Sequence, residues 1–236
     1  MSIAANLERI RAEIADACAR ADRRPEDVNL MAVSKVHPAE AILEAYAAGQ
    51  RLFGENRVQE WQTKLPQMGN LFDPAHNADP ARMHLIGPLQ SNKTSRAAEL
   101  FHAVDTLDAI RIAERLHATA RSLGKQLPVL IEVKLSSEES KHGLAPEELP
   151  AFLEALRTFD ALIPSGLMTV PPWSEDAETA RPYFQHLRRL RDENMAIHPT
   201  LTELSMGMSN DFRVAIEEGS TTVRIGTAIF GKRVYT

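Results

Sequence analysis

The sequence predicts a single (β/α)8 barrel of the TIM type, preceded by an extra N-terminal helix. Short apolar runs alternate with amphipathic stretches along the whole 236-residue chain. Several of the runs, such as 128–133, are continuously apolar, as strands buried on both faces are. Such a barrel commonly has about 250 residues in one domain, so we expect residues 1–236 to form one domain. A doubly wound open sheet is the alternative, but no GxGxxG motif follows the first expected strand.

The expected elements follow one another in a regular order. The opening helix spans about 3–21 and carries an apolar residue every three or four positions. We expect strands near 28–34, 51–54, 83–87, 101–105, 128–134, 162–168, 201–206 and 221–226. Residues 66–82 form the one long irregular segment. It should be an elaborated loop that enters the third strand from its N-terminal side, away from the functional end of the barrel.

Composition excludes several classes of function. The net charge is −5, from 27 basic and 32 acidic residues, and no basic stripe indicates a nucleic-acid partner. Neither a signal peptide nor a membrane span is apparent, and the single cysteine, Cys18, continues the apolar spacing of the first helix. We therefore expect a cytoplasmic protein without a membrane partner. The histidines lack metal-ligand spacing, so we expect no metal site.

A lysine stands where a barrel of this kind builds its site. Lys35 follows the first apolar strand, and residues after the strands share one rim of a barrel. A partly desolvated lysine loses its proton more easily and can form a Schiff base with an aldehyde. Further lysines fall at or just after strand ends, namely Lys93, Lys134 and Lys141. Taken alone, Lys35 could equally be a surface lysine.

The last two strand ends indicate a phosphate site. Gly207 and Gly226 allow the backbone to approach a ligand, and Ser205 and Thr227 add hydroxyl groups. Ser209 should open a helix whose N–H groups point outward. Loops after strands seven and eight are the usual phosphate site of this barrel. Taken singly, Ser209 could be a simple helix cap and Gly226 a simple tight turn.

Two other polar residues have plain structural alternatives. Asn56, with Gln59 three residues later, fits a helix N-cap as well as a ligand contact. His84 lies inside an expected strand and is more simply a hydrogen-bonded core histidine.

Six motifs follow one another along the chain: LMAVSK (30–35), FGENRVQE (53–60), HLIGPLQSNK (84–93), GLM (166–168), LSMGMS (204–209) and VRIGTAIFG (223–231). Together they resemble the pyridoxal phosphate homeostasis protein family, a relative of the pyridoxal-phosphate barrel of alanine racemase. The likeness runs from about residue 6 to residue 233. Departures at Met83 and at Val36-His37 remove no proposed contact.

The resemblance implies a set of cofactor contacts. Lys35 would hold pyridoxal 5′-phosphate as a Schiff base, and Arg224 would face the pyridine nitrogen. The phosphate would be bound by Ser205, Gly226 and Thr227. Asn56 would lie near the cofactor. Met168 and Met206 complete the expected set, although methionines at such positions more often pack in the core.

The resemblance favours a carrier that stores, buffers or delivers the cofactor to apo-enzymes, as a monomer or weak dimer. The alternative is an amino-acid racemase, which needs a second acid/base opposite the lysine. The tyrosines, Tyr46, Tyr183 and Tyr235, fall on helix faces or in the C-terminal tail. An aldolase is a third possibility and would leave Arg224 without a role. We therefore expect a protein without catalytic residues.

Overall fold

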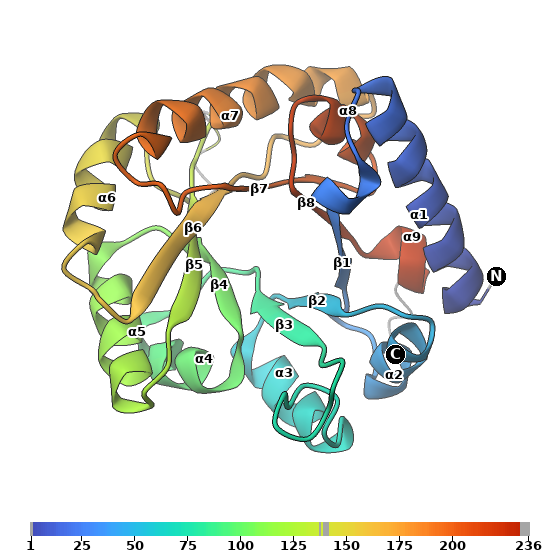
Figure 1. The fold of residues 1–236 in the computed structure, drawn as a ribbon, viewed down its shortest axis with the longest axis horizontal. Coiled ribbons are helices and arrows are strands. Elements are labelled where there is room, and N and C mark those ends of the chain that lie inside the picture. Colours follow the sequence, from blue (N-terminus) through green and yellow to red (C-terminus); the bar gives the residue numbers. More distant parts are fainter. Residues whose placement is uncertain (1, 137, 139–141, 232–236) are drawn as a thin grey trace.

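Eight parallel strands form a closed barrel in chain order (Figure 1). The computed structural model describes residues 2–136, 138 and 142–231. The strands are β1 (Asn29–Val33), β2 (Leu52–Glu55), β3 (Arg82–Leu85), β4 (Ala103–Leu107), β5 (Leu127–Glu132), β6 (Leu162–Met168), β7 (Glu203–Met208) and β8 (Thr222–Ile225). The barrel closes where β8 pairs with β1 from Asn29↔Thr222 to Ala32↔Ile225. The predicted (β/α)8 architecture is confirmed.

Helices surround the barrel (Figure 1). They are α1 (Ile3–Arg20), α2 (Ala39–Ala47), α3 (Val58–Lys64), α4 (Thr94–Leu100), α5 (Ile110–Ser122), α6 (Leu149–Leu156), α7 (Arg181–Met195), α8 (Phe212–Glu217) and α9 (Thr227–Phe230). The extra helix α1 begins after Ser2, whose hydroxyl accepts a hydrogen bond from the Ala5 amide at 3.3 Å. Its apolar face, which includes the fully buried Cys18, contacts α2, α8 and α9.

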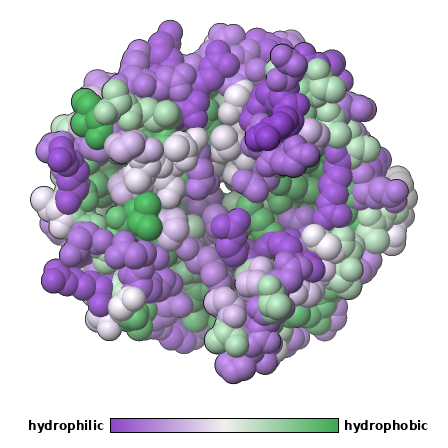
Figure 2. Space-filling model, in the orientation of Figure 1, coloured by the Kyte–Doolittle hydropathy of each residue, from purple (hydrophilic) through white to green (hydrophobic). Residues whose placement is uncertain are grey.

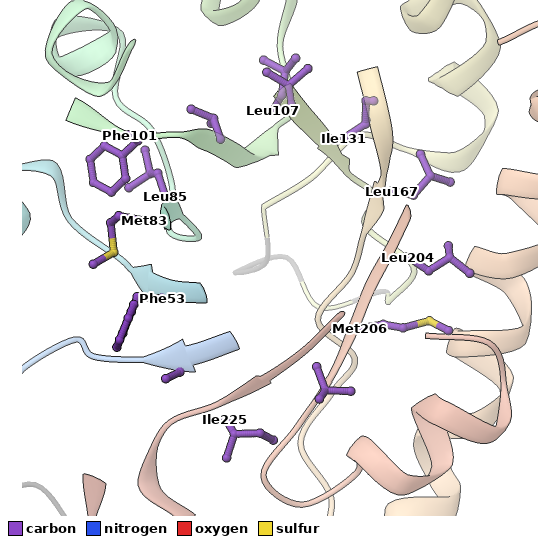
Figure 3. Packing of buried hydrophobic residues seen from close by; sticks show 14 of the residues in the cluster. Phe53, Met83, Leu85, Phe101, Leu107, Ile131, Leu167, Leu204, Met206 and Ile225 are labelled. Atoms are coloured by element: carbon purple, nitrogen blue, oxygen red, sulfur yellow. The ribbon is translucent and has the colours of Figure 1, made fainter. Parts of the chain in front are cut away.

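The main core lies between the strands and the helices. Alternate strand residues point to opposite faces of a sheet, and the outward-facing set joins one continuous apolar cluster. Figure 3 labels ten residues of this cluster, which lie around the outside of the strands, with Leu204 and Met206 projecting outward from β7. The outer surface in the view of Figure 2 is mainly hydrophilic, with small, separated hydrophobic areas. None of the described helices is long and apolar enough to cross a membrane.

The opposite faces of several strands carry polar side chains into the barrel. His84 of β3 lies 3.1 Å from the carboxylate of Asp105 on β4, and both side chains are largely buried. Ser205 of β7 and Arg224 of β8 are also buried. Burying polar groups costs free energy unless they are hydrogen-bonded. A polar interior in an otherwise apolar barrel therefore indicates a functional role for that interior.

The irregular segment 66–82 is anchored by aromatic packing. The Phe72 ring lies 4.9 Å from that of Trp61 and 5.9 Å from that of Phe53. The Tyr46 hydroxyl donates to the backbone oxygen of Asp79 at 2.9 Å. The segment leads into the N-terminal end of β3 and contributes nothing to the cavity described below, as the sequence predicts.

A cofactor-sized cavity at the C-terminal rim of the barrel

A cavity of about 510 Å³ opens among the C-terminal ends of the strands; we refer to it as the rim cavity. Five of the eight residues expected at the site line it, and they come from segments after β1, after β2 and in or after β8: Lys35, Asn56, Arg224, Gly226 and Thr227. The volume lies within the range of roughly 300–1,000 Å³ that small-molecule sites occupy. The parallel strands bring these distant residues together because their C-terminal ends share one rim.

Lys35 sits in a tight turn directly after β1. The Ser34 amide donates to the Gly54 carbonyl at 3.0 Å, and the His37 amide donates back to the Ser34 carbonyl at 3.1 Å. Val36 has a φ of 60°, a conformation that costs a β-branched residue on the order of 1–3 kcal/mol. Lys35 is half-buried and contributes to the wall of the cavity. The turn therefore holds the lysine at the rim in a strained backbone.

Arg224 provides a fixed positive charge within the cavity wall. Its guanidinium donates to the Ser205 hydroxyl at 2.7 Å and to the Thr169 carbonyl at 2.9 Å. Only 5% of the residue is exposed. Burial lowers the pKa of Arg224, while the carboxylates of Asp105, Glu132 and Asp211 act in the opposite direction, in that order. The residue thus presents an oriented cation whose position is set by Ser205 of β7 and by Thr169, the residue after β6.

At the β8–α9 junction, the backbone of Gly226 faces the cavity without a side chain to cover it. A Cβ atom added to Gly226 would lie 3.3 Å from the Val33 carbonyl oxygen, against the cavity wall. The first internal hydrogen bonds of α9 run to the Gly226 carbonyl from the Ile229 and Phe230 amides. The amides of the first helical turn precede this ladder and have no acceptor within the helix. Together with the Thr227 hydroxyl, they form a neutral donor group suited to an anion.

A bulge in β7 decides which of its residues reach the cavity. Ser205 pairs with Thr222 and Met208 with Arg224, so β7 advances by three residues where β8 advances by two. Gly207 occupies the extra position with a φ of 94°. The bulge turns the following residues, Met208 to Asp211, toward the cavity.

Asp211 fixes the turn that follows the bulge. Its carboxylate accepts from the Met208 amide at 2.6 Å, and its own amide donates to the Met208 carbonyl at 3.1 Å. Burial raises the pKa of Asp211, and the Met208 hydrogen bond and Arg224 oppose the increase. The closed turn places Ser209 and Asn210 in the cavity wall.

The structure places several expected contacts elsewhere. Ser205 is fully buried against Arg224, Met206 belongs to the outer apolar core, and Met168 is buried at the end of β6; none of the three is in the cavity lining. Met206 points outward because strand residues alternate, as Figure 3 shows. The N-cap of α3 is Arg57, so Asn56 is not the cap. Likewise, α8 begins at Phe212, and Ser209 lies in the preceding turn.

One wall of the cavity was not predicted from the sequence. Residues 170–174, after β6, line it, and Trp173 is 76% exposed. The Asn210 side-chain amide donates to the Ser174 carbonyl at 2.9 Å and ties this segment to the β7–α8 turn. A Pro-Pro-Trp sequence (171–173), separated by two residues from the end of an expected strand, could have indicated this wall. Among the other rim lysines, Lys134 lines a separate smaller cavity, Lys93 lines neither, and Lys141 lies outside the described residues.

The closed barrel, with a lysine after β1 and an arginine in β8, agrees with the class expected from the sequence, a pyridoxal-phosphate barrel. A family model described as alanine racemase, N-terminal domain, matches residues 5–234. A pyridoxal phosphate homeostasis protein of Vibrio alginolyticus is 44% identical over 235 residues, covering 100% of this chain and 99% of the relative. The chain belongs to the family of pyridoxal phosphate homeostasis proteins.

Solved structures agree with this assignment. PipY of Synechococcus elongatus PCC7942, solved with pyridoxal phosphate bound, is 39% identical and superimposes with a TM-score of 0.85, covering 98% of this chain and 100% of PipY. An alanine racemase of Clostridium difficile 630 is 14% identical with a TM-score of 0.72, covering 97% of this chain and 58% of the racemase. The second similarity shows a shared barrel fold.

Proposed function

We propose that this protein binds pyridoxal 5′-phosphate in the rim cavity and serves the cofactor's supply to apo-enzymes rather than catalysis. The observation that carries the proposal is the convergence of Lys35, Arg224 and the Gly226–Thr227 backbone on one cavity of about 510 Å³. An amine, a fixed cation and a neutral anion-binding backbone match the aldehyde, ring and phosphate of this cofactor. The cofactor bound in PipY supports the same assignment.

The residues divide the work of binding. When bound, the cofactor supplies an aldehyde that condenses with a primary amine, releasing water, and a ring that withdraws electrons when its nitrogen is protonated. Lys35 is the proposed covalent anchor. Gly226 and Thr227, joined by Ser209 in place of Ser205, are the proposed phosphate donors. Arg224 is proposed to face the ring nitrogen, where a cation disfavours protonation and weakens the ring as an electron sink.

The composition of the cavity wall favours a carrier over a racemase. Within the described lining, the titratable side chains are Lys35, Asp211 and Arg224. Arg224 is held by Ser205 and Thr169, and the Asp211 carboxylate is engaged by the Met208 amide. Tyr46 bonds to the loop that enters β3 from the opposite end of the barrel. None of these side chains is placed as a free second base, and we propose that the protein lacks one.

Two assays test the carrier function. The loaded protein should reactivate an apo-enzyme that requires pyridoxal 5′-phosphate. In deuterated water it should exchange the α-proton of alanine far more slowly than ordinary enzymes turn over, which is about 1 s⁻¹ or faster. Rapid exchange or racemisation of any amino acid would overturn the carrier proposal and favour the racemase. A protein that binds no cofactor would overturn both.

The phosphate donors can be tested individually. We expect Thr227→Val and Ser209→Ala each to weaken cofactor binding by roughly ten- to a hundredfold, because a hydrogen bond to a charged group contributes about 1.5–3 kcal/mol. Binding is measured by titration of the visible band. Thr221→Val, whose hydroxyl binds the Leu204 backbone outside the cavity, is the control. Full affinity in both cavity variants would remove these hydroxyls from the site.

A further inference from the structure

Side chains from α3 and β2 form hydrogen bonds with the turn that carries Lys35. None of these side chains lines the rim cavity. The Lys64 ammonium donates to the Ser34 carbonyl at 3.1 Å. The Ser34 hydroxyl donates to the Glu55 carboxylate at 2.7 Å. The Val36 amide donates to the Glu60 carboxylate at 2.5 Å. Three side chains therefore bind the residues immediately before and after Lys35.

These three side chains also form one ion cluster. The Lys64 ammonium lies 2.8 Å from the Glu55 carboxylate and 2.7 Å from that of Glu60. The Lys64 side chain is 9% exposed and that of Glu55 is fully buried. Burial raises the pKa of Glu55, and Lys64 opposes the increase. Burying charges is expensive even when they are paired, so a cluster whose contacts converge on one tripeptide indicates a role in shaping it.

Val36 carries the backbone strain in this turn. Its φ of 60° is disfavoured for a β-branched residue, and its side chain has little packing to hold it, since the residue is 59% exposed. The bond from its amide to Glu60 retains this conformation together with the bond from the His37 amide to the Ser34 carbonyl, which closes the turn. We expect that without the Glu60 bond the turn relaxes toward ordinary backbone angles and Lys35 moves with it.

We propose that Glu60 and Lys64, anchored on Glu55, are positioning residues that hold the strained Ser34–Val36 turn so that Lys35 stays in the rim cavity. This inference rests on the proposed function, since Lys35 is the anchor proposed for the cofactor. The cluster acts on the lysine through the backbone, and its bonds to the turn involve none of the proposed phosphate donors, Ser209, Gly226 and Thr227.

The test compares an aldehyde with an alcohol in the same cavity. Pyridoxal 5′-phosphate binds through Lys35 and its phosphate, whereas pyridoxine 5′-phosphate lacks the aldehyde and tests the cavity without the lysine. We expect Glu60→Ala to weaken pyridoxal 5′-phosphate binding and to slow the borohydride-trapped reaction at Lys35, each by about tenfold. Affinity for pyridoxine 5′-phosphate should stay within about twofold. Glu114→Ala, on the exposed face of α5, is the matched control.

Three further variants separate positioning from general damage. Glu60→Asp keeps the charge but withdraws the carboxylate from Val36, so it should behave as Glu60→Ala does. Glu60→Gln keeps an acceptor oxygen and should retain most of the affinity. Val36→Gly placed in Glu60→Ala should restore binding to within about threefold of wild type, because glycine adopts positive φ without strain.

The outcomes are distinguishable. Unchanged binding of pyridoxal 5′-phosphate in Glu60→Ala and Glu60→Asp, or equal losses for both ligands, would overturn the positioning role. So would a failure of Val36→Gly to restore binding. A wild-type protein that forms no borohydride-sensitive adduct would instead overturn the proposed function, and this is read before any variant is compared.

Discussion

Replacing Lys35 with alanine should reduce the affinity for pyridoxal 5′-phosphate by more than about a hundredfold and abolish the visible absorption band. The covalent bond and the other contacts of the lysine side chain are lost together, and each tenfold loss corresponds to about 1.4 kcal/mol. The fold should remain, because Lys35 lies at the rim and is only half-buried. Spectral titration and thermal melting of the same preparation measure the two effects.

Lys93→Ala provides the control for this experiment. Lys93 ends the short 3-10 turn after β3 and is absent from the cavity lining, so its replacement should leave the spectrum unchanged. Borohydride reduction followed by peptide mapping identifies the attachment point in the wild-type protein. A labelled peptide that contains Lys93, Lys134 or Lys141 instead of Lys35 would refute the assignment.

Among the variants described, Arg224→Met should lower the free energy of unfolding the most. The variant removes the hydrogen bonds to Ser205 and Thr169 and the positive charge that faces Asp105, Glu132 and Asp211. Each buried hydrogen-bond partner left unsatisfied costs about 1–3 kcal/mol. Urea unfolding near pH 8 measures the effect. Arg213→Met, which breaks an exposed pair with Glu13, should cost less than about 1 kcal/mol.

The loss in Arg224→Met should shrink as the pH falls. Burial already raises the pKa of Asp211, and Arg224 lowers it, so the variant raises this pKa further. An acid whose folded-state pKa exceeds its unfolded-state value binds protons more readily in the folded state, and stability then decreases as the pH rises through that interval. The difference between variant and wild type should therefore be smaller at pH 5 than at pH 8. A loss independent of pH would contradict this account.

The sequence was sufficient to predict the barrel and several of the residues that meet at its C-terminal rim. Strand and helix patterns depend on neighbouring residues, so the apolar runs that became β1 to β8 could be located directly. Once a parallel barrel is predicted, Lys35, Arg224 and Gly226 must meet at one rim because all strands end there. The five expected residues that line the cavity follow from this rule.

Other parts of the site were decided by the tertiary structure alone. Ser205, before the bulge, supports Arg224. A single extra residue at Gly207 shifts the register of the residues that follow, so Ser209 reaches the cavity. The apolar character of Met206 is equally consistent with the core and with a ligand contact, and only the strand register assigns it to the core.

By itself, the sequence determined the fold class and the position of Lys35 and Arg224 at one rim of the barrel. The tertiary structure decided the wall around Trp173 and the ion cluster that grips the Lys35 turn. The physical reason is the separation along the sequence of the residues that interact. Periodicity and turn chemistry act over a few residues, whereas the bonds from Lys64 to Ser34 and from Asn210 to Ser174 join residues 30 and 36 positions apart. Such contacts exist only after the barrel has closed and set the distance between its loops.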